Sequence, residues 1–317
     1  MTQKFGKKDY STKHNISGKV STGETFSLGY DFRMHHLLGY WDLELGGFYA
    51  NPTDFQYFYG IGNETVKDQD LFNQDYYKMR YKSFSFKGGM LHDFWKQSSC
   101  SGLLRYENNE GQLDKQETIL ADTTYFGEDK VNLAEIDMRL DFDFRDDPNL
   151  PTDGMRFYLS HNNGFILNND NSNYGKTLAF LEYFVSVRPF TLGIKTGGGS
   201  SYGDIPFYNQ FSFGQNTYLR GYRNNRFTGE AMAFFNSELR LQFFDLKTVL
   251  VPIRVGITGF FDAGQIFQSG EDSDKWHTGY GFGIYVVPLE ARYTLNLSAG
   301  FSEEESLLIT FGLGGTF

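Results

Sequence analysis

The sequence has few of the features that mark membrane-helix and disulfide-stabilised proteins. Its single cysteine, Cys100, excludes an internal disulfide and a cysteine-based metal cluster. Its apolar residues never form a run of the roughly 20 residues that a membrane helix needs. The amino terminus, MTQKFGKKDY, lacks the apolar segment of a secretory signal peptide. The 29 Lys and Arg residues are outnumbered by 39 acidic ones, and the net charge of −10 argues against a nucleic-acid partner.

Aromatic residues and glycine are abundant instead. The chain has 33 Phe, 21 Tyr and 36 Gly but only 7 Pro, and its mean hydropathy is negative. So many aromatic residues with so little continuous apolar sequence are unusual in a soluble protein. They are typical of a transmembrane β-barrel, where lipid-facing residues alternate with polar lumen residues and aromatic girdles mark both interfaces.

The clearest local pattern is strict alternation of polar and apolar residues over Val131–Arg145. Side chains on a strand project to opposite faces with a period of two, so this pattern predicts a strand with one charged and one apolar face. Six charges on one face suit a watery lumen better than a soluble core. The charged face holds Glu135, Asp137, Arg139, Asp141, Asp143 and Arg145, and the apolar face holds Ile136, Met138, Leu140, Phe142 and Phe144.

Alternation with intervening turn residues recurs along the chain and indicates about fifteen strands. A weaker candidate, Thr2–Lys7, would make sixteen, in keeping with the even numbers of bacterial barrels. The parity of Tyr76–Phe94 breaks near Ser83, where we expect a β-bulge or a sharp bend. We therefore predict an all-β fold: an antiparallel transmembrane β-barrel of about 16 strands. Residues 1–317 are expected to form this single barrel domain, with any upstream soluble domain absent from the chain.

One loop is notable for the residues that follow it. The segment LRGYRNNRF, Leu219–Phe227, lies in the longest connection of the carboxyl-terminal half and carries three arginines. Glu238 and Asp262 lie on the next two expected strands, each in the polar parity, so both would point inward in a closed barrel. An arginine offers a planar fork of donors that two carboxylates can accept from at once. The glycine-rich run Thr196–Asp204 precedes no helix, and we expect it to give the wall room for this loop.

These motifs, in this order, resemble the bacterial surface-antigen, or BamA-type, superfamily of outer-membrane barrels. The turn FRDDPNLPTDG at Phe144–Gly154, the LRGY motif with its downstream acids, and the terminal TFGLGGTF carry the resemblance. In that family an Arg-Gly-aromatic loop folds back into the lumen against acidic strand residues. The resemblance implies a lumen loop motif of Leu219, Arg220, Gly221 and Tyr222, with partners Glu238, Asp262 and Gly264.

The end of the chain also fits the resemblance. The terminal Phe317, with Gly312 five residues before it, is similar to the signal by which barrel proteins are handed to the assembly machinery. Glycines make Ser306–Phe317 a weak strand, because glycine packs no side chain in a sheet. Its expected partner across the closure is Thr2–Lys7. We therefore predict that this junction, the seam, is the most labile in the barrel.

The sequence leaves two functional classes open. In the first, the barrel inserts or translocates polypeptide through the weak seam. In the second, it is a membrane anchor or narrow pore for an appended phosphoesterase domain, because FYGIGNET at Phe58–Thr65 resembles the barrels fused to a calcineurin-like phosphoesterase. A general diffusion porin is disfavoured, since a docked loop would occlude it. Lipid is the expected partner in either class, with polypeptide clients or a soluble domain beside it.

No catalytic constellation is evident. The sequence lacks a nucleophile elbow, a phosphate-binding glycine loop and a metal-ligand pattern such as HExxH. The adjacent pair His35–His36 is expected at a hairpin tip without an acidic companion, and surface histidines are the favoured interpretation of all six. We therefore expect no enzyme activity, no metal and no cofactor.

Overall fold

The computed structural model describes residues 2–3, 11–21, 24–112, 118–169, 172–215, 217–246, 253–288 and 294–313. Its helices are short: α1 (Gln69–Asn73), α2 (Ile119–Asp122) and the 3-10 turn η1 (Phe207–Asn209). None of the helices in these ranges is long and apolar enough to span a membrane. The strands are β1 (Thr2–Gln3), β2 (Thr12–Val20), β3 (Phe26–Leu38), β4 (Trp41–Ala50), β5 (Gln56–Tyr57), β6 (Lys78–Trp95), β7 (Ser98–Gln112), β8 (Val131–Asp143), β9 (Gly154–Ile166), β10 (Asn173–Val187), β11 (Phe190–Gly203), β12 (Phe211–Phe213), β13 (Phe227–Gly229), β14 (Ala231–Leu246), β15 (Ile253–Phe267), β16 (His277–Pro288), β17 (Leu295–Ser302) and β18 (Leu308–Leu313).

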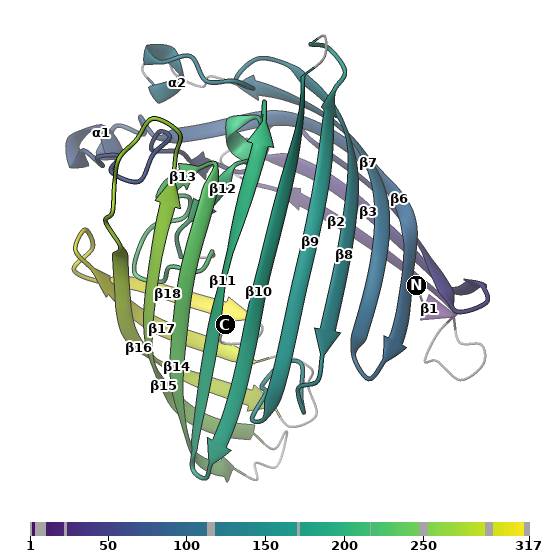
Figure 1. Ribbon diagram of the computed structural model, residues 1–317, viewed down its shortest axis with the longest axis vertical. Coiled ribbons are helices and arrows are strands. Elements are labelled where there is room, and N and C mark those ends of the chain that lie inside the picture. Colours follow the sequence, from purple (N-terminus) through teal and green to yellow (C-terminus); the bar gives the residue numbers. More distant parts are fainter. Residues whose placement is uncertain are drawn as a thin grey trace.

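The strands form one sheet that curls into a barrel-shaped wall (Figure 1). Within the described residues the sheet has 16 strands, and each strand of the path from β1 to β18 pairs with its neighbour in the chain order. Two departures interrupt this simple order: β5 pairs only with β6, and β12 and β13 form a separate two-stranded sheet. The antiparallel all-β architecture and the number of strands predicted from the alternation are confirmed.

The two faces of the wall differ as the alternation predicts. On β8, Ile136 and Met138 are 39% and 48% exposed, whereas Glu135 and Asp137 are buried on the opposite face. The same alternation holds on β3, where Phe26, Leu28 and Tyr30 are exposed. The wall therefore carries an apolar outer face and a polar inner face, opposite to the arrangement in a soluble barrel.

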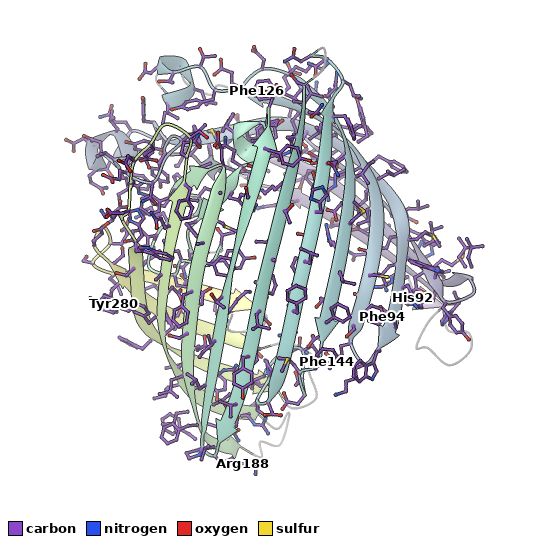
Figure 2. All side chains as sticks on the ribbon, viewed as in Figure 1. His92, Phe94, Phe126, Phe144, Arg188 and Tyr280 are labelled. Carbon is purple, nitrogen blue, oxygen red and sulfur yellow. The ribbon has the colours of Figure 1, made fainter. Side chains whose placement is uncertain are left out.

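The connections at the two ends of the wall differ in length. Residues 96–97 and 188–189 are two-residue turns at one end, here called the short-turn end. Residues 51–77 and 204–230 connect strands at the other, the long-loop end. Figure 2 shows Arg188 at the short-turn end and Phe126 at the opposite end of the wall.

A hydrophobic core lies at the long-loop end. Phe58, Tyr59 and Tyr77 from the β4–β6 connection pack with Ile119 of α2 and with Phe207 of η1. These segments are far apart in sequence, so the cluster joins three separate connections into one folded cap.

The bulge expected near Ser83 is wrong. The pairing of β6 with β7 is regular from Arg80 to Asp93, and the irregularity falls between Asp93 and Trp95. The parity breaks where β6 runs past the end of its pairing with β4 at Ser83, and there Met79, Arg80 and Tyr81 are all buried. Tyr81 packs in the cap on one face, while the guanidinium of Arg80 lies 3.5 Å from the centre of the Phe55 ring on the other.

The two ends of the sheet are edge strands. β1 pairs with β2, and β18 pairs with β17; no pairing between β1 and β18 is present in the part of the chain that the structure describes. The closing strands proposed from sequence, Thr2–Lys7 and Ser306–Phe317, lie partly outside the described residues. The seam therefore stays a prediction.

Candidate functional site

The connection between β11 and β14 folds against the inner face of the wall. Its short sheet, β12–β13, belongs to a core in which Phe213, Leu219 and Tyr222 are fully buried. Met232 and Phe234 of β14 and Ile266 of β15 complete this core from the wall side. A loop rich in arginine is thus held by its own aromatic and aliphatic residues, and we call residues 211–229 the docked loop.

Arg220 lies at the centre of the polar contacts of the docked loop. Its Nε and Nη2 donate to the two carboxylate oxygens of Asp262 at 2.8 and 2.7 Å, and Nη1 donates to Glu238 Oε2 at 2.8 Å. The backbone N–H of Arg220 also donates to Asp262, at 2.9 Å. The structure therefore brings together three of the residues singled out in the sequence, from the loop, β14 and β15.

The charges of this cluster balance. The carboxylates of Glu238 and Asp262 are 0% exposed, and the Arg220 side chain is 14% exposed. Arg240, also buried, places its Nε 3.1 Å from Glu238 Oε1. Two guanidinium groups thus face two carboxylates, and an aromatic ring, that of Phe260, lies 4.1 Å from the Arg220 guanidinium carbon. Arg220 is hydrogen-bonded to both carboxylates, whereas Arg240 contacts Glu238 as an ion pair without a hydrogen bond, so the two carboxylates depend chiefly on Arg220.

Glycines in the wall make room for the docked loop. A Cβ atom at Gly264 would lie 2.9 Å from the Phe213 ring, and one at Gly199 would lie 2.4 Å from the Phe211 ring. Gly221, with a φ of +94°, approaches the backbone of Phe301. The sequence pointed to Gly264 and to the glycine run that holds Gly199, but it missed Gly279 and Gly300, because glycine alone does not mark a close approach and several other strands also contain it.

Gly279 gives a testable consequence. A Cβ at this position would lie 1.8 Å from the backbone oxygen of Arg220, so Gly279→Ala must displace the loop backbone. Such overpacking costs about 1–3 kcal/mol. We expect trypsin to cleave after Arg220 faster in the folded Gly279→Ala variant. Gly102→Ala is the control, because a Cβ there meets nothing within 4 Å; equal cleavage in the two variants would contradict a docked Arg220.

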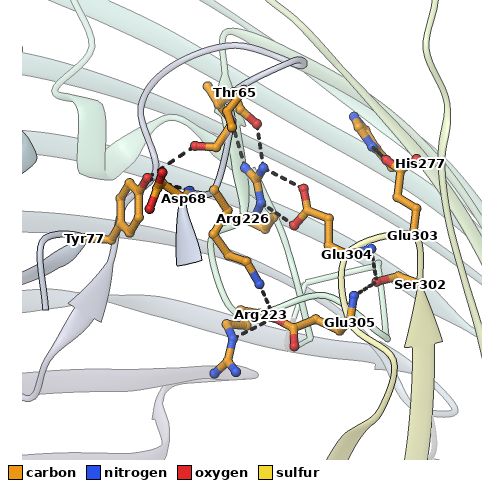
Figure 3. A network of polar contacts seen from close by, with 12 residues as sticks. Thr65, Asp68, Tyr77, Arg223, Arg226, His277, Ser302, Glu303, Glu304 and Glu305 are labelled. Carbon is orange, nitrogen blue, oxygen red and sulfur yellow. Dashed lines mark hydrogen bonds and ion pairs between the residues drawn. The ribbon is translucent and has the colours of Figure 1, made fainter. Parts of the chain in front are cut away.

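The other two arginines of the docked loop bind the β17–β18 turn (Figure 3). Arg226, 1% exposed, donates from Nε and Nη2 to the two carboxylate oxygens of Glu304, each at 2.6 Å. Arg223 Nε donates to Glu305 Oε1 at 2.8 Å. These glutamates were not predicted, because they lie 78 and 82 residues from their partners and share no strand periodicity with them.

The segment Phe58–Thr65 is a structural element of the cap. The side chain of Asn63, 0% exposed, donates to Ser273 Oγ at 2.9 Å and accepts from the Ile266 backbone N–H at 3.0 Å. Its backbone N–H donates to Glu271 at 2.7 Å. The conspicuous FYGIGNET residues therefore tie the β4–β6 connection to β15 and to the β15–β16 connection.

Two interpretations of the histidines are wrong. His35 has an acidic companion, since its Nδ1 lies 2.5 Å from Asp42 Oδ2. His277 is buried, stacked on the Phe227 ring at 3.7 Å, with Nε2 2.8 Å from the backbone oxygen of Asn63. Neither contact is visible from spacing in the sequence. Among the described residues no group of three or more His, Cys, Asp and Glu side chains could hold a metal ion.

The terminal signal is described only in part. Gly312 of β18 pairs with Asn296 of β17, and a Cβ at Gly312 would lie 2.4 Å from Asn296 Oδ1. Phe317 lies outside the described residues.

A barrel wall with an apolar outer face and a polar inner face is the architecture of a transmembrane β-barrel, and here the inner face also carries an Arg-Gly-aromatic loop. The sequence model of the Omp85 superfamily domain matches residues 10–317, and the chain belongs to this superfamily. It is a β-barrel of the bacterial outer membrane, and its apolar outer face is the lipid-facing one. A search of curated proteins gives no match.

Several solved protein structures share this fold. BamA from Haemophilus ducreyi lacking POTRA domains 1–3 aligns with a TM-score of 0.70 and 14% identity, covering 96% of this chain and 64% of that one. CdiB from Escherichia coli aligns with a TM-score of 0.61 and 12% identity, covering 93% of this chain and 54% of that one. CdiB from Acinetobacter baumannii gives 0.54 and 11%, covering 96% and 52%. The chain spans less than two thirds of the length of each of these proteins.

Proposed function

We propose that this barrel inserts polypeptide into the outer membrane, or translocates it across, by parting at the seam between its first and last strands. The observation that carries the proposal is the strand pairing of β18. Among the described residues this strand pairs with β17 alone, and no described strand pairs with its other edge. Such an edge is costly in lipid and is a template on which an incoming strand can pair.

The last two strands are also shorter, within the described residues, than the strands in the middle of the wall. β17 and β18 contain 8 and 6 residues, against 13 in β8 and 16 in β14. On the outer face of β18, Ile309, Phe311 and Leu313 are 66–69% exposed. Fewer backbone hydrogen bonds and less side-chain burial lower the local free energy of opening. A short last strand with little side-chain burial supports a mechanism in which its pairing across the seam is exchanged for pairing with a client strand.

The docked loop has a supporting role in this proposal. The Arg220 cluster fixes the loop to β14 and β15, and the tip at Gly221 lies against β17 next to the last strand. We infer that the loop occupies the lumen, narrows its bore and stiffens the wall beside the seam. The proposed activity exchanges one strand pairing for another, and it requires no catalytic group and no cofactor. Its partners are lipid and a polypeptide client.

Hydrogen exchange tests the lability of the last strand. We expect the amides of residues 308–313 to exchange faster than those of 131–143 in the barrel reconstituted in lipid, because opening of an edge strand breaks fewer bonds. Equal protection of the two strands would remove the physical basis for parting of the seam.

The alternative function, an anchor or narrow pore for an appended phosphoesterase, is favoured by the Phe58–Thr65 segment alone. The cap and the docked loop would suit a closed anchor as well as an insertion barrel. The full reading frame separates the two: upstream soluble repeats favour polypeptide insertion, and a phosphoesterase domain favours the anchor.

A further inference from the structure

The turn between β17 and β18 presents three consecutive glutamates, Glu303, Glu304 and Glu305. Adjacent carboxylates repel one another, so such a turn needs cations around it. The backbone N–H groups of Glu304 and Glu305 donate to Ser302 Oγ at 3.3 and 3.1 Å, which orders the turn. Each glutamate then faces a different basic group: Glu303 lies 2.7 Å from the ammonium of Lys275, and the other two bind the docked loop.

Glu304 and Arg226 form the most buried of these contacts. The guanidinium of Arg226 also donates to the Thr65 side chain at 2.9 Å and to the Thr65 backbone oxygen at 2.5 Å. One buried arginine thus joins the β17–β18 turn to the β4–β6 connection. A planar guanidinium can donate in two directions at once, whereas a lysine ammonium cannot reproduce both forks.

Glu305 adds a second link to the same connection. Its Oε1 accepts from Lys67 Nζ at 2.5 Å and from Arg223 Nε at 2.8 Å. Burial acts to raise the pKa of the Glu305 carboxyl, but the hydrogen bonds from Lys67 and Arg223 outweigh it and hold that pKa below its ordinary value. The carboxylate is therefore charged and paired at neutral pH. We call Thr65, Lys67, Arg223, Arg226, Glu304 and Glu305 the clasp.

The clasp joins opposite ends of the sheet. Lys67 and Glu305 are 238 residues apart in sequence. Thr65 and Lys67 follow β4, the fourth strand from the first edge, and the glutamates precede β18, the strand at the other edge. Because every clasp residue lies in a connection at the long-loop end, the clasp connects the last strand to the first four strands there independently of any strand ladder.

We propose that the clasp holds the seam together at the long-loop end, so that the seam parts from the short-turn end. This inference rests on the proposed function, and it adds direction to it: a client strand enters from the short-turn side and advances toward the clasp. The clasp acts as a hinge that limits how far the edges separate. Releasing the clasp should let the whole seam open.

Spin-label distances across the two edges test this direction. With Cys100→Ser as background, labels at Val20 and Ile309 report the long-loop end of β2 and β18. Labels at Ile16 and Leu313 report the seam closer to the short-turn end. All four labelled side chains are exposed on the outer face, between 66% and 82%. In lipid we expect a narrow distance distribution for the first pair and a broad one for the second.

Two variants release the clasp in different ways. Glu304→Gln removes the charge of a residue that is 20% exposed, and Arg226→Lys keeps the charge but loses the two-way fork. Each should broaden the Val20–Ile309 distribution at least about twofold, as expected when a local opening becomes accessible. Lys78→Gln is the matched control, because its ion pair with Asp75 lies at the end of the same connection, where β6 begins, and outside the clasp.

The outcomes separate the clasp from the seam. The clasp proposal fails if the Val20–Ile309 distribution is broad in the parent protein. It also fails if that distribution stays narrow in both variants while the Ile16–Leu313 distribution is broad. Neither result contradicts parting of the seam. Narrow distributions for both pairs in the parent and both variants contradict parting of the seam, and the hinge fails with it. Broadening by Lys78→Gln as large as that by Glu304→Gln also overturns the clasp, because the effect would then belong to any charge change in the cap.

Discussion

Arg220→Ala is expected to destabilise the folded barrel by about 3–5 kcal/mol, the cost of removing one partner from a buried ion pair. The substitution removes the Arg220 guanidinium from Glu238 and Asp262, both with side chains 0% exposed, and leaves Glu238 with the ion pair to Arg240. It also removes the contact over the Phe260 ring. The measurement is the free energy of unfolding in a reversible urea titration of the barrel in lipid vesicles.

Arg139→Ala is the matched control. Arg139 binds Asp137 with the same two-bond fork, at 2.8 Å for both bonds, on the same inner face. Its side chain is 41% exposed, so water screens the pair and the expected cost is below about 1 kcal/mol. A double-mutant cycle between Arg220 and Asp262 isolates the pairwise energy. A negligible interaction energy in that cycle, or equal costs for the two arginines, would mean that the cluster does not hold the loop.

Met138→Arg is expected to cost about 2–4 kcal/mol, because it places a charge on the lipid-facing side of β8. Asn162→Arg introduces the same side chain on the inner face of β9 at nearly the same height, where Asp137 pairs with Asn162 and Met138 with His161. It should cost clearly less than Met138→Arg, because Asn162 lines a cavity of the inner face beside the carboxylates of Glu135 and Asp137, which can pair with the new guanidinium. The same urea titration in lipid compares the two variants. Equal costs would contradict the assignment of the lipid and lumen faces.

Local patterning predicted the wall because strand alternation is a short-range property. From Glu135 to Asp143 the polarity of each residue matches its face, whereas the apolar Val131 and Leu133 are buried on the same face as Glu135. In β6 the consecutive residues Met79, Arg80 and Tyr81 are all buried, so polarity there no longer indicates the face of a residue. The expected bulge was an error of this kind.

Contacts between connections could not be predicted in the same way. The parity of Glu238 and Asp262 pointed them toward the inner face, and the motif supplied Arg220 as a partner. No such rule links Arg226 to Glu304 or Asn63 to Glu271, because loops have no periodicity and these pairs are 78 and 208 residues apart. The burial of His277, which rests on contacts with such connections, escaped prediction for the same reason. His35 and Asp42 lie on neighbouring strands, and their pairing was missed because the β3–β4 register is irregular between Met34 and Leu38.

The most direct test of the proposed function is whether a client strand pairs with the edge of β18 that faces away from β17. In a Cys100→Ser background, single cysteines at Ile309 and at Met138 are both exposed on the outer face, one on the last strand and one in the middle of the wall. An unfolded outer-membrane protein carrying single cysteines along its final strand is added to the barrel in lipid, and disulfide formation is measured. The account predicts cross-links to Ile309→Cys at alternate client positions, the period of a paired strand, and none to Met138→Cys. Cross-links without this period, or equal yields at the two sites, would contradict it.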